Sequence, residues 1–255
     1  MSDAQREVIA SPPDDGLSAE LRIALLSDVH GNLTALTAVA DALVTEEPLD
    51  DIVVAGDLLQ GGPRPREVWE FLIANEWTLI RGNEDESLQL DPQWTYVGSD
   101  RYRNAFLAGT AWTRSQIGDE ILTRLVALPD RWRRVTPAGD LLVVHASPRS
   151  IVDQAGGVHN SMVDVTEAYA GTGAQVIAFG HYHRAFVRTT PFALLINVAS
   201  VGLPRDGRAV ACYTIVTSSR DGWVVEQRQV PYDPDEEARI AAERGMPSWT
   251  ADASP

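Results

Sequence analysis

Imidazole, carboxylate and amide side chains recur in this chain directly after apolar runs of strand length. They stand in "LLSDVHGN" (25–32), "VVAGDLL" (53–59), "LIRGNED" (79–85), "VVHASP" (143–148) and "FGHYH" (179–183). Polar groups at strand ends of an α/β fold are where ligands usually bind, because the turns there are exposed while the strands beneath fix them. The five blocks therefore predict one shared site.

The side chains of these blocks suit a particular kind of ion. They combine imidazole, carboxylate and one amide oxygen without thiolate, which favours divalent ions such as Mn²⁺, Fe²⁺ or Zn²⁺. Asp-x-His and Gly-His-x-His each put two ligands on one side of an extended segment, because alternate residues share a face. Six or seven ligands exceed the need of one tetrahedral ion, and a carboxylate can bridge two metals about 3.5 to 4 Å apart. The set favours a two-metal site.

Each residue also has an ordinary structural explanation. Asp28 could cap the helix that follows it, His145 could be a hydrogen-bonded core histidine, and "GNEDE" (82–86) could be a solvated turn. Taken together, these explanations require five apolar runs to end in such groups by coincidence. We therefore prefer the single site.

The elements that must position the site follow an alternating pattern. Between the first two apolar runs, Leu33, Leu36, Ala40 and Leu43 recur at helical spacing. Strand and helix alternate through the first eighty residues, which predicts an α/β layered fold. Residues 86–135 have a helical pattern without a strand, so we expect a helical insertion there. After residue 170 the pattern is mainly strand after strand.

Length, composition and charge narrow the class of protein. The 255 residues are 44% hydrophobic, which allows a single domain over 21–255, and the polar stretch 1–20 is expected to be a disordered tail. A formal charge of −15 argues against binding to long nucleic acid or anionic membrane. No run approaches the roughly 20 apolar residues that cross a bilayer, and the single cysteine, Cys212, offers no disulfide. We expect a cytoplasmic protein.

The five blocks resemble the signature of the calcineurin-like metallophosphoesterases. That signature runs Asp-x-His, Gly-Asp, Gly-Asn-His, a lone His after a strand, and Gly-His-x-His, and the blocks keep this order over roughly 21–216. "SDVHGNLTAL" and "VASVGLPRDGR" also resemble the bacterial YfcE-like phosphodiesterase branch, which includes some dinucleoside polyphosphate hydrolases. The resemblance implies two mixed β-sheets packed face to face with helices on the outside, a four-layer α/β/β/α sandwich.

The resemblance also implies a ligand set for two divalent ions, with Mn²⁺ favoured and Fe²⁺, Zn²⁺ or Ni²⁺ as alternatives. Asp57 would bridge both ions, the first of which would be held by Asp28, His30 and His183, and the second by Asn83, His145 and His181. A hydroxide between the metals would attack phosphorus in line. The expected substrate is a small phosphodiester or a nucleotide phosphoanhydride. Arg149 and Arg205 are candidate phosphate clamps, because guanidinium matches a phosphate edge with two hydrogen bonds.

One position departs from the family pattern. Many members have His after Gly-Asn, credited with protonating the leaving oxygen, whereas this chain has Glu84. We expect Glu84 to be ionised, as a surface-type carboxylate is near neutral pH. His159, Asp85 or a metal-bound water are alternatives for the general acid. The implied catalytic residues are Asp57, Asn83, Glu84 and His145.

Other functions stay open at this point. A phosphoprotein or phosphomonoester phosphatase is disfavoured by the missing His. A non-catalytic binding or scaffold protein that keeps the fold, as the retromer subunit of this superfamily does, has no need of the full ligand set. A nuclease acting on long DNA or RNA is disfavoured by the acidic charge and by the absence of a basic stripe.

Overall fold

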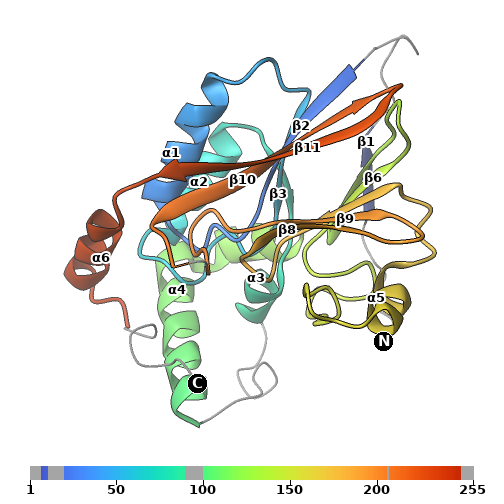
Figure 1. The fold of residues 1–255 in the computed structure, drawn as a ribbon. Coiled ribbons are helices and arrows are strands. Elements are labelled where there is room, and N and C mark those ends of the chain that lie inside the picture. The colour runs from blue at the N-terminus through green and yellow to red at the C-terminus, as the bar shows by residue number, and fades with distance from the viewer. Residues whose placement is uncertain (1–6, 11–19, 90–99, 206, 248–255) are drawn as a thin grey trace.

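Two mixed β-sheets form the centre of the fold (Figure 1). The computed structural model describes residues 7–10, 20–89, 100–205 and 207–247. In the five-stranded sheet, whose order is β11-β10-β2-β3-β4, strands β2, β3 and β4 run parallel to one another, while β10 is antiparallel to both of its neighbours, β2 and β11. Their bounds are Glu20–Leu26 (β2), Asp51–Ala55 (β3), Thr78–Ile80 (β4), Val210–Ser219 (β10) and Gly222–Pro231 (β11).

The six-stranded sheet has the order β1-β5-β6-β7-β9-β8. Strands β6, β7 and β9 run parallel to one another, while β5 and β8 are antiparallel to their neighbours β6 and β9. The bounds are Glu7–Ala10 (β1), Arg131–Arg134 (β5), Leu141–Val144 (β6), Val176–Phe179 (β7), Ala185–Thr189 (β8) and Leu194–Val198 (β9).

Three apolar layers show why the sheets stack as they do. In β2, Ile23 and Leu25 face the six-stranded sheet, whereas Ala24 and Leu26 pack with the outer helices, because alternate strand residues point to opposite faces. A third layer packs the far face of the six-stranded sheet against α5. The predicted four-layer sandwich is confirmed. The helices are Leu33–Val44 (α1), Pro65–Ala74 (α2), Asn83–Ser87 (α3), Asp100–Val126 (α4), Met162–Tyr169 (α5) and Pro234–Glu243 (α6).

Two expectations about organisation need correction. Glu7–Ala10, inside the predicted disordered tail, form β1 and pair in parallel with Arg131–Arg134. The same pairing places a strand inside the segment 86–135, where the pattern predicted none. The sequence of β5 is "RWRR", and its three arginines give no apolar strand pattern. Only Trp132 of this strand is buried, between the two sheets. The rest of 1–19 and residues 90–99 lie outside the described residues.

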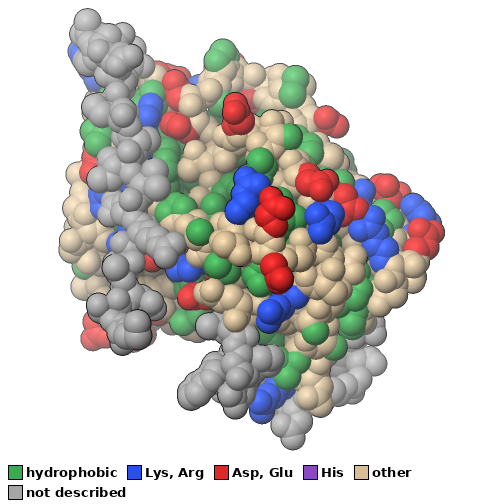
Figure 2. All heavy atoms as spheres, turned by 180° about the vertical axis from the view of Figure 1, so that it is seen from behind, with side chains coloured by type: hydrophobic (Ala, Val, Ile, Leu, Met, Phe, Trp, Pro, Cys, Tyr) green, Lys and Arg blue, Asp and Glu red, His purple; other side chains and the backbone are tan. Residues whose placement is uncertain are grey.

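The face of the molecule opposite to that of Figure 1 carries charges of both signs. From behind, acidic and basic side chains lie interspersed over this face of the molecule (Figure 2). Among the described residues, opposite charges pair at the surface, as Arg239 does with Glu243 one helical turn later. Within the described residues, none of the helices combines the length and the apolar character that a membrane crossing requires.

Candidate metal centre

The predicted ligands lie where strands of both sheets end. Parallel strands β2, β3 and β4 end at one edge of the five-stranded sheet, and parallel β6 and β7 end at one edge of the other. The segments just after these strands carry all seven side chains: Asp28 and His30 after β2, Asp57 after β3, Asn83 at the start of α3 after β4, His145 after β6, and His181 and His183 after β7. Asn32, not Asp28, caps α1, by accepting from the Ala35 backbone N–H.

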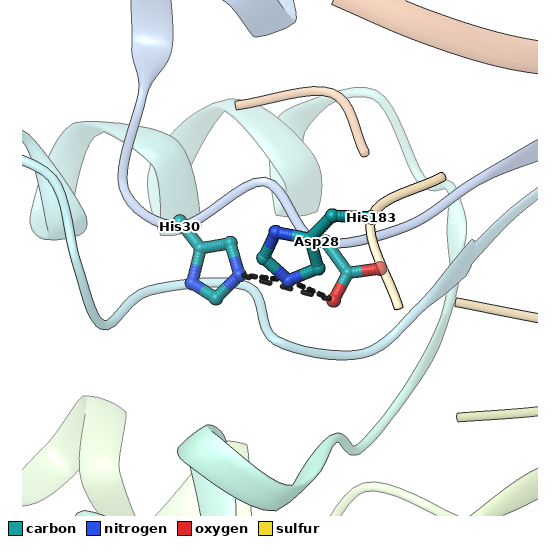
Figure 3. Close-up of side chains that lie close together, drawn as sticks. All are labelled: Asp28, His30 and His183. Carbon is teal, nitrogen blue, oxygen red and sulfur yellow. Dashed lines mark hydrogen bonds and ion pairs between the residues drawn. The ribbon is translucent and has the colours of Figure 1, made fainter. Parts of the chain in front are cut away.

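Asp28, His30 and His183 form a first group (Figure 3). The Nε2 atoms of the two histidines lie 3.2 Å apart, and Nε2 of His183 lies 3.1 Å from Oδ1 of Asp28. In both rings the other nitrogen, Nδ1, lies 2.7 Å from a backbone carbonyl oxygen, that of Gln60 for His30 and that of Leu203 for His183. A carbonyl can only accept, so each Nδ1 carries a proton, and in the neutral ring each Nε2 presents a lone pair. Three acceptor atoms therefore converge in a buried place.

Asn83, His145 and His181 form a second group. Oδ1 of Asn83 lies 2.8 Å from Nε2 of His145 and 2.8 Å from Nδ1 of His181. The two ring nitrogens are 3.3 Å apart. Nδ1 of His145 donates to the carbonyl oxygen of Ala55 at 2.8 Å, which orients the ring with Nε2 toward the group. This group too could hold a cation.

Asp57 lies between the two groups. Its Oδ2 is 3.3 Å from Nε2 of His145. Ligand atoms of Asp57 also lie within 4.8 Å of those of Asp28 and, in another cluster, of His30 and Glu84. Its Oδ1 accepts a 2.8 Å hydrogen bond from the backbone N–H of Glu84, at the start of α3. One carboxylate thus reaches both groups, and an amide fixes its orientation.

The backbone at the site is strained. Positive φ is uncommon for residues other than glycine and costs about 1 to 3 kcal/mol, and such residues cluster at functional sites. Backbone hydrogen bonds between neighbouring loops hold this conformation, including Asp28 N–H to Gly56 O and His30 N–H to Asp57 O, both 3.0 Å. Five of the seven predicted ligands have positive φ: Asp28 (55°), His30 (51°), Asp57 (53°), His181 (68°) and His183 (57°).

Two glycines of the sequence blocks are needed for close approach. A Cβ on Gly82 would lie 2.2 Å from Oδ1 of Asp57, and one on Gly180 would lie 2.3 Å from Oδ2 of Asp28. Atoms cannot approach so closely without displacement. The Gly in Gly-Asn and in Gly-His-x-His therefore lets one ligand loop pack directly on the carboxylate of another.

Ionisation in the site is coupled through buried charges. Burial opposes protonation of His145, but the negative charge of Asp57 outweighs it and raises the pKa of His145 to about 10. Burial likewise opposes ionisation of Asp57 and Asp28, but neighbouring histidines outweigh it and lower both pKa values. Burial, with the charge of His145, lowers the pKa of His181 to about 4. Without cations, the carboxylates are thus balanced by a protonated His145.

Glu84 and Asp85 differ from the sequence expectation. The Glu84 side chain is only 20% exposed, and its Oε2 is buried without a hydrogen-bond partner among the described residues. Burial raises its pKa to about 8 against the opposing effect of His30, so it is not an ordinary surface carboxylate. Asp85 is fully buried and accepts from the backbone N–H groups of Leu58 and Gly82. Its carboxylate ties the loop after β3 to α3, which makes it a structural residue rather than an acid facing a substrate.

The remaining candidates lie at the surface. The guanidinium of Arg149 donates two hydrogen bonds to the carboxylate of Asp153, at 2.9 and 3.1 Å, so its bidentate edge is already occupied. Arg205 is exposed and adjoins the first group, because its backbone N–H donates to the His183 carbonyl oxygen at 3.1 Å. No hydrogen bond or ion pair of its guanidinium is found with the described residues. His159 is exposed in a loop. Arg205 is thus the better placed of the two clamps.

Sequence reasoning missed two glutamines that contact the predicted ligands. Gln60 is buried, gives its backbone oxygen to His30, and accepts through its side chain from Thr110 of α4 at 3.2 Å. Nε2 of Gln154 lies 2.7 Å from Nε2 of His181. Gln60 directly follows the Gly-Asp block, but its role depends on its backbone oxygen, for which the side-chain pattern gave no signal; Gln154 belongs to none of the five blocks.

Comparison with known proteins agrees with the geometry. The family profile described as the calcineurin-like phosphoesterase superfamily domain matches residues 21–221. An uncharacterised protein of Methanocaldococcus jannaschii is 27% identical over 247 residues, covering 89% of this chain and 94% of that protein. A metallophosphoesterase structure from Sphaerobacter thermophilus is 27% identical, with a TM-score of 0.67 over 89% of this chain and 95% of that one. A hypothetical protein from Pyrococcus horikoshii, 19% identical with the same coverage, has the same fold, at a TM-score of 0.74. The chain thus belongs to the metal-dependent calcineurin-like phosphoesterase superfamily and is a phosphoesterase.

Proposed function

We propose that this chain hydrolyses small phosphodiesters or nucleotide phosphoanhydrides with the help of two divalent ions, of which Mn²⁺ is the favoured one. The first ion is held by Asp28, His30 and His183, and the second by Asn83, His145 and His181, with Asp57 contacting both. The complete set of side chains argues against a non-catalytic scaffold, which has no use for them.

The convergence of lone pairs is the observation that carries this proposal. In the first group, the Nε2 atoms of His30 and His183, which carry lone pairs in the neutral rings, lie 3.2 Å apart, beside the fully buried carboxylate of Asp28. Buried acceptors that face one another without a donor are unfavourable, because each has lost its hydrogen bond to water. A cation removes that penalty for all of them at once. Imidazole with carboxylate and amide oxygen is also a donor set that divalent transition metals accept.

Divalent ions bound here would supply Lewis acidity, which lowers the pKa of a coordinated water to near neutral and offsets charge on the phosphate oxygens. The chain's own residues hold and orient the reacting groups. The amide of Glu84 keeps Asp57 turned between the two groups. Arg205 lies at the exposed side of the first group, where its guanidinium would bind a phosphate oxygen of the substrate.

Glu84 is the reason for preferring diesters and anhydrides over monoesters. Its buried carboxyl lies near His30 and Asp57, in the position where many relatives have an acid that protonates the leaving oxygen. A carboxylate there repels a dianionic monoester more than a monoanionic diester, because like charges at short range are unfavourable. The leaving groups of aryl esters and anhydrides also depart without protonation by an acid.

A substrate panel tests this proposal. Metal-stripped protein is assayed with added Mn²⁺ on bis(p-nitrophenyl) phosphate, p-nitrophenyl phosphate, cyclic nucleotides, dinucleoside polyphosphates and sugar phosphates. We expect Mn²⁺-dependent turnover that is fastest on the aryl diester and the anhydrides. Turnover confined to monoesters would contradict the proposed substrate class, and unchanged turnover in the metal-stripped protein would contradict the metal requirement.

Metal removal is also expected to reverse how stability depends on pH. Without metal, the folded protein raises the pKa of Glu84 from 4.5 to about 8 and that of His145 from 6.5 to about 10. Between pH 6.5 and 8 the folded state thus binds more protons than the unfolded state, so stability falls as pH rises, by up to about 1.4 kcal/mol per pH unit and group. With Mn²⁺, stability should rise over this window, because the ligands must lose protons to bind.

Thermal melts at pH 6.5 and at pH 8, each with Mn²⁺ and with a chelator, test this pH dependence. The chelated protein should melt lower, because an ion that binds only the folded state stabilises it. Identical melting curves with and without chelator would count against a metal site.

A further inference from the structure

His181 is held differently from the other three histidines of the site. In those three, the ring nitrogen turned away from the group donates to a backbone carbonyl oxygen, which can only accept. The corresponding nitrogen of His181, Nε2, instead lies 2.7 Å from the side-chain amide nitrogen of Gln154. A carboxamide contains both a donor and an acceptor. The partner of His181 can therefore change its role.

The proton positions of this pair depend on whether a metal is bound. In the structure, the NH₂ group of Gln154 donates to Nε2 of His181, so the ring proton is on Nδ1, which points at Oδ1 of Asn83 at 2.8 Å. That arrangement is complete without a metal. Nδ1 is also the atom that faces the second group, and it can bind a cation only through its lone pair. The proton must then be on Nε2, where it faces another donor.

A half-turn of the Gln154 carboxamide resolves this conflict. It puts Oε1 in the place of the NH₂ group, and Oε1 then accepts a hydrogen bond from the Nε2–H of His181 at a similar distance. Hydrogen bonds of this kind to the outer nitrogen fix the tautomer of a metal-bound histidine and raise its basicity. The half-turn needs no movement of the backbone.

The loop that carries Gln154 is well fixed, although the side chain itself is exposed. The hydroxyl of Tyr182, the neighbour of His181, donates to the Asp153 carbonyl oxygen at 3.2 Å and accepts from the Gly156 N–H at 2.7 Å. Asp153 in turn accepts from Ser147, close to the second group's His145, at 2.8 Å. The loop is thus fixed on both sides of Gln154, beside His181.

We propose that Gln154 is a positioning residue for the second metal ion, and that its carboxamide turns over when the ion binds, so that Oε1 accepts from Nε2 of His181. This inference rests on the proposed function, because it requires a metal at the second group. It assigns Gln154 no contact with the metal or the substrate.

Metal titration of three variants tests the inference. Metal-stripped wild type, Gln154→Leu, Gln154→Glu and, as a matched control, Gln116→Leu are titrated with Mn²⁺ against a competing chelator. Gln116 lies on α4, where its side chain donates a hydrogen bond to the hydroxyl of Ser115 at 3.1 Å. We expect Gln154→Leu to bind one of the two ions about 10- to 100-fold more weakly. Mutation of the residues that hold metal ligands in place typically lowers metal affinity by this factor. Gln154→Glu, which can only accept, should bind it at least as tightly as wild type, and the control should be unchanged.

The tautomer itself gives a second readout that does not depend on activity. Imidazole nitrogen chemical shifts with diamagnetic Zn²⁺ should show the His181 proton on Nδ1 in the metal-free protein and on Nε2 when metal is bound. This measurement also decides the case if Gln154→Leu does not fold. Wild type that binds two ions with His181 protonated on Nε2 throughout, or Gln154→Leu that binds both ions as wild type does, would overturn the inference. Wild type that binds fewer than two ions would overturn the proposed function first.

Discussion

Asp57→Asn is expected to lower kcat on an aryl diester by about 10³-fold or more while the protein stays folded. The carboxylate reaches both groups and faces His145 at 3.3 Å with one oxygen, while the other accepts from the Glu84 amide. Asparagine can keep that second hydrogen bond with its single oxygen, but it then turns an NH₂ group toward the metals. Losing the shared ligand and its charge removes several kcal/mol of metal-based stabilisation, and about 4 kcal/mol corresponds to about 10³-fold in rate.

A surface aspartate provides the matched control for this variant. Asp140 pairs with Arg133 at 3.1 Å and is partly exposed, so Asp140→Asn should leave kcat unchanged, because surface ion pairs contribute little. Metal content and kcat are measured for both variants. An Asp57→Asn protein with wild-type activity and two bound ions would end the two-metal proposal.

The positions that could be predicted from sequence are those where local pattern and chemistry coincide. Asp28 and His30 follow a strand whose alternation is visible in the sequence, with Ile23 and Leu25 on one face and Ala24 on the other. Strand ends in a parallel sheet share an edge, so the residues just beyond them could be expected to meet. The layered fold and the convergence of the ligand side chains follow from the same pattern.

What could not be predicted depends on contacts between distant segments. Strand β5, "RWRR", has one buried residue, Trp132, and becomes a strand only because β1 and β6 pair with it. Gln154 meets His181 across 27 positions, through a loop whose path is set by Tyr182. The burial of Glu84 likewise depends on the loops around it, and for that reason its sequence-based classification as a surface carboxylate is wrong.

Glu84→His is expected to change the rate selectively, according to the leaving group. Burial raises the pKa of Glu84 to about 8. Divalent cations bound at His30 and Asp57 would lower that pKa again, because opposite charge at short range favours the ionised form. An ionised Glu84 cannot donate a proton, so the leaving group of the wild-type reaction must depart on its own acidity. A histidine at this position can donate.

The gain should therefore be confined to poor leaving groups. General acid help is worth about 10²- to 10⁴-fold, so alkyl esters should speed up in Glu84→His by up to that factor, whereas aryl diesters and anhydrides should change little. Glu84→Gln separates acid from charge, because it removes the repulsion toward dianionic monoesters without adding a proton donor. Glu84→Gln should therefore raise the rate of monoester hydrolysis whatever the leaving group.

The decisive measurement is kcat/KM for diesters of graded leaving-group acidity, in wild type and in both variants. Wild type and Glu84→Gln should show a steep dependence of rate on the acidity of the leaving alcohol, since neither assists its departure. Glu84→His should show a shallow one. A parallel shift of the whole series in Glu84→His would show that residue 84 acts only through charge or packing. A shallow dependence already present in wild type, and lost in Glu84→Gln, would show that Glu84 remains protonated beside the metals and is itself the acid.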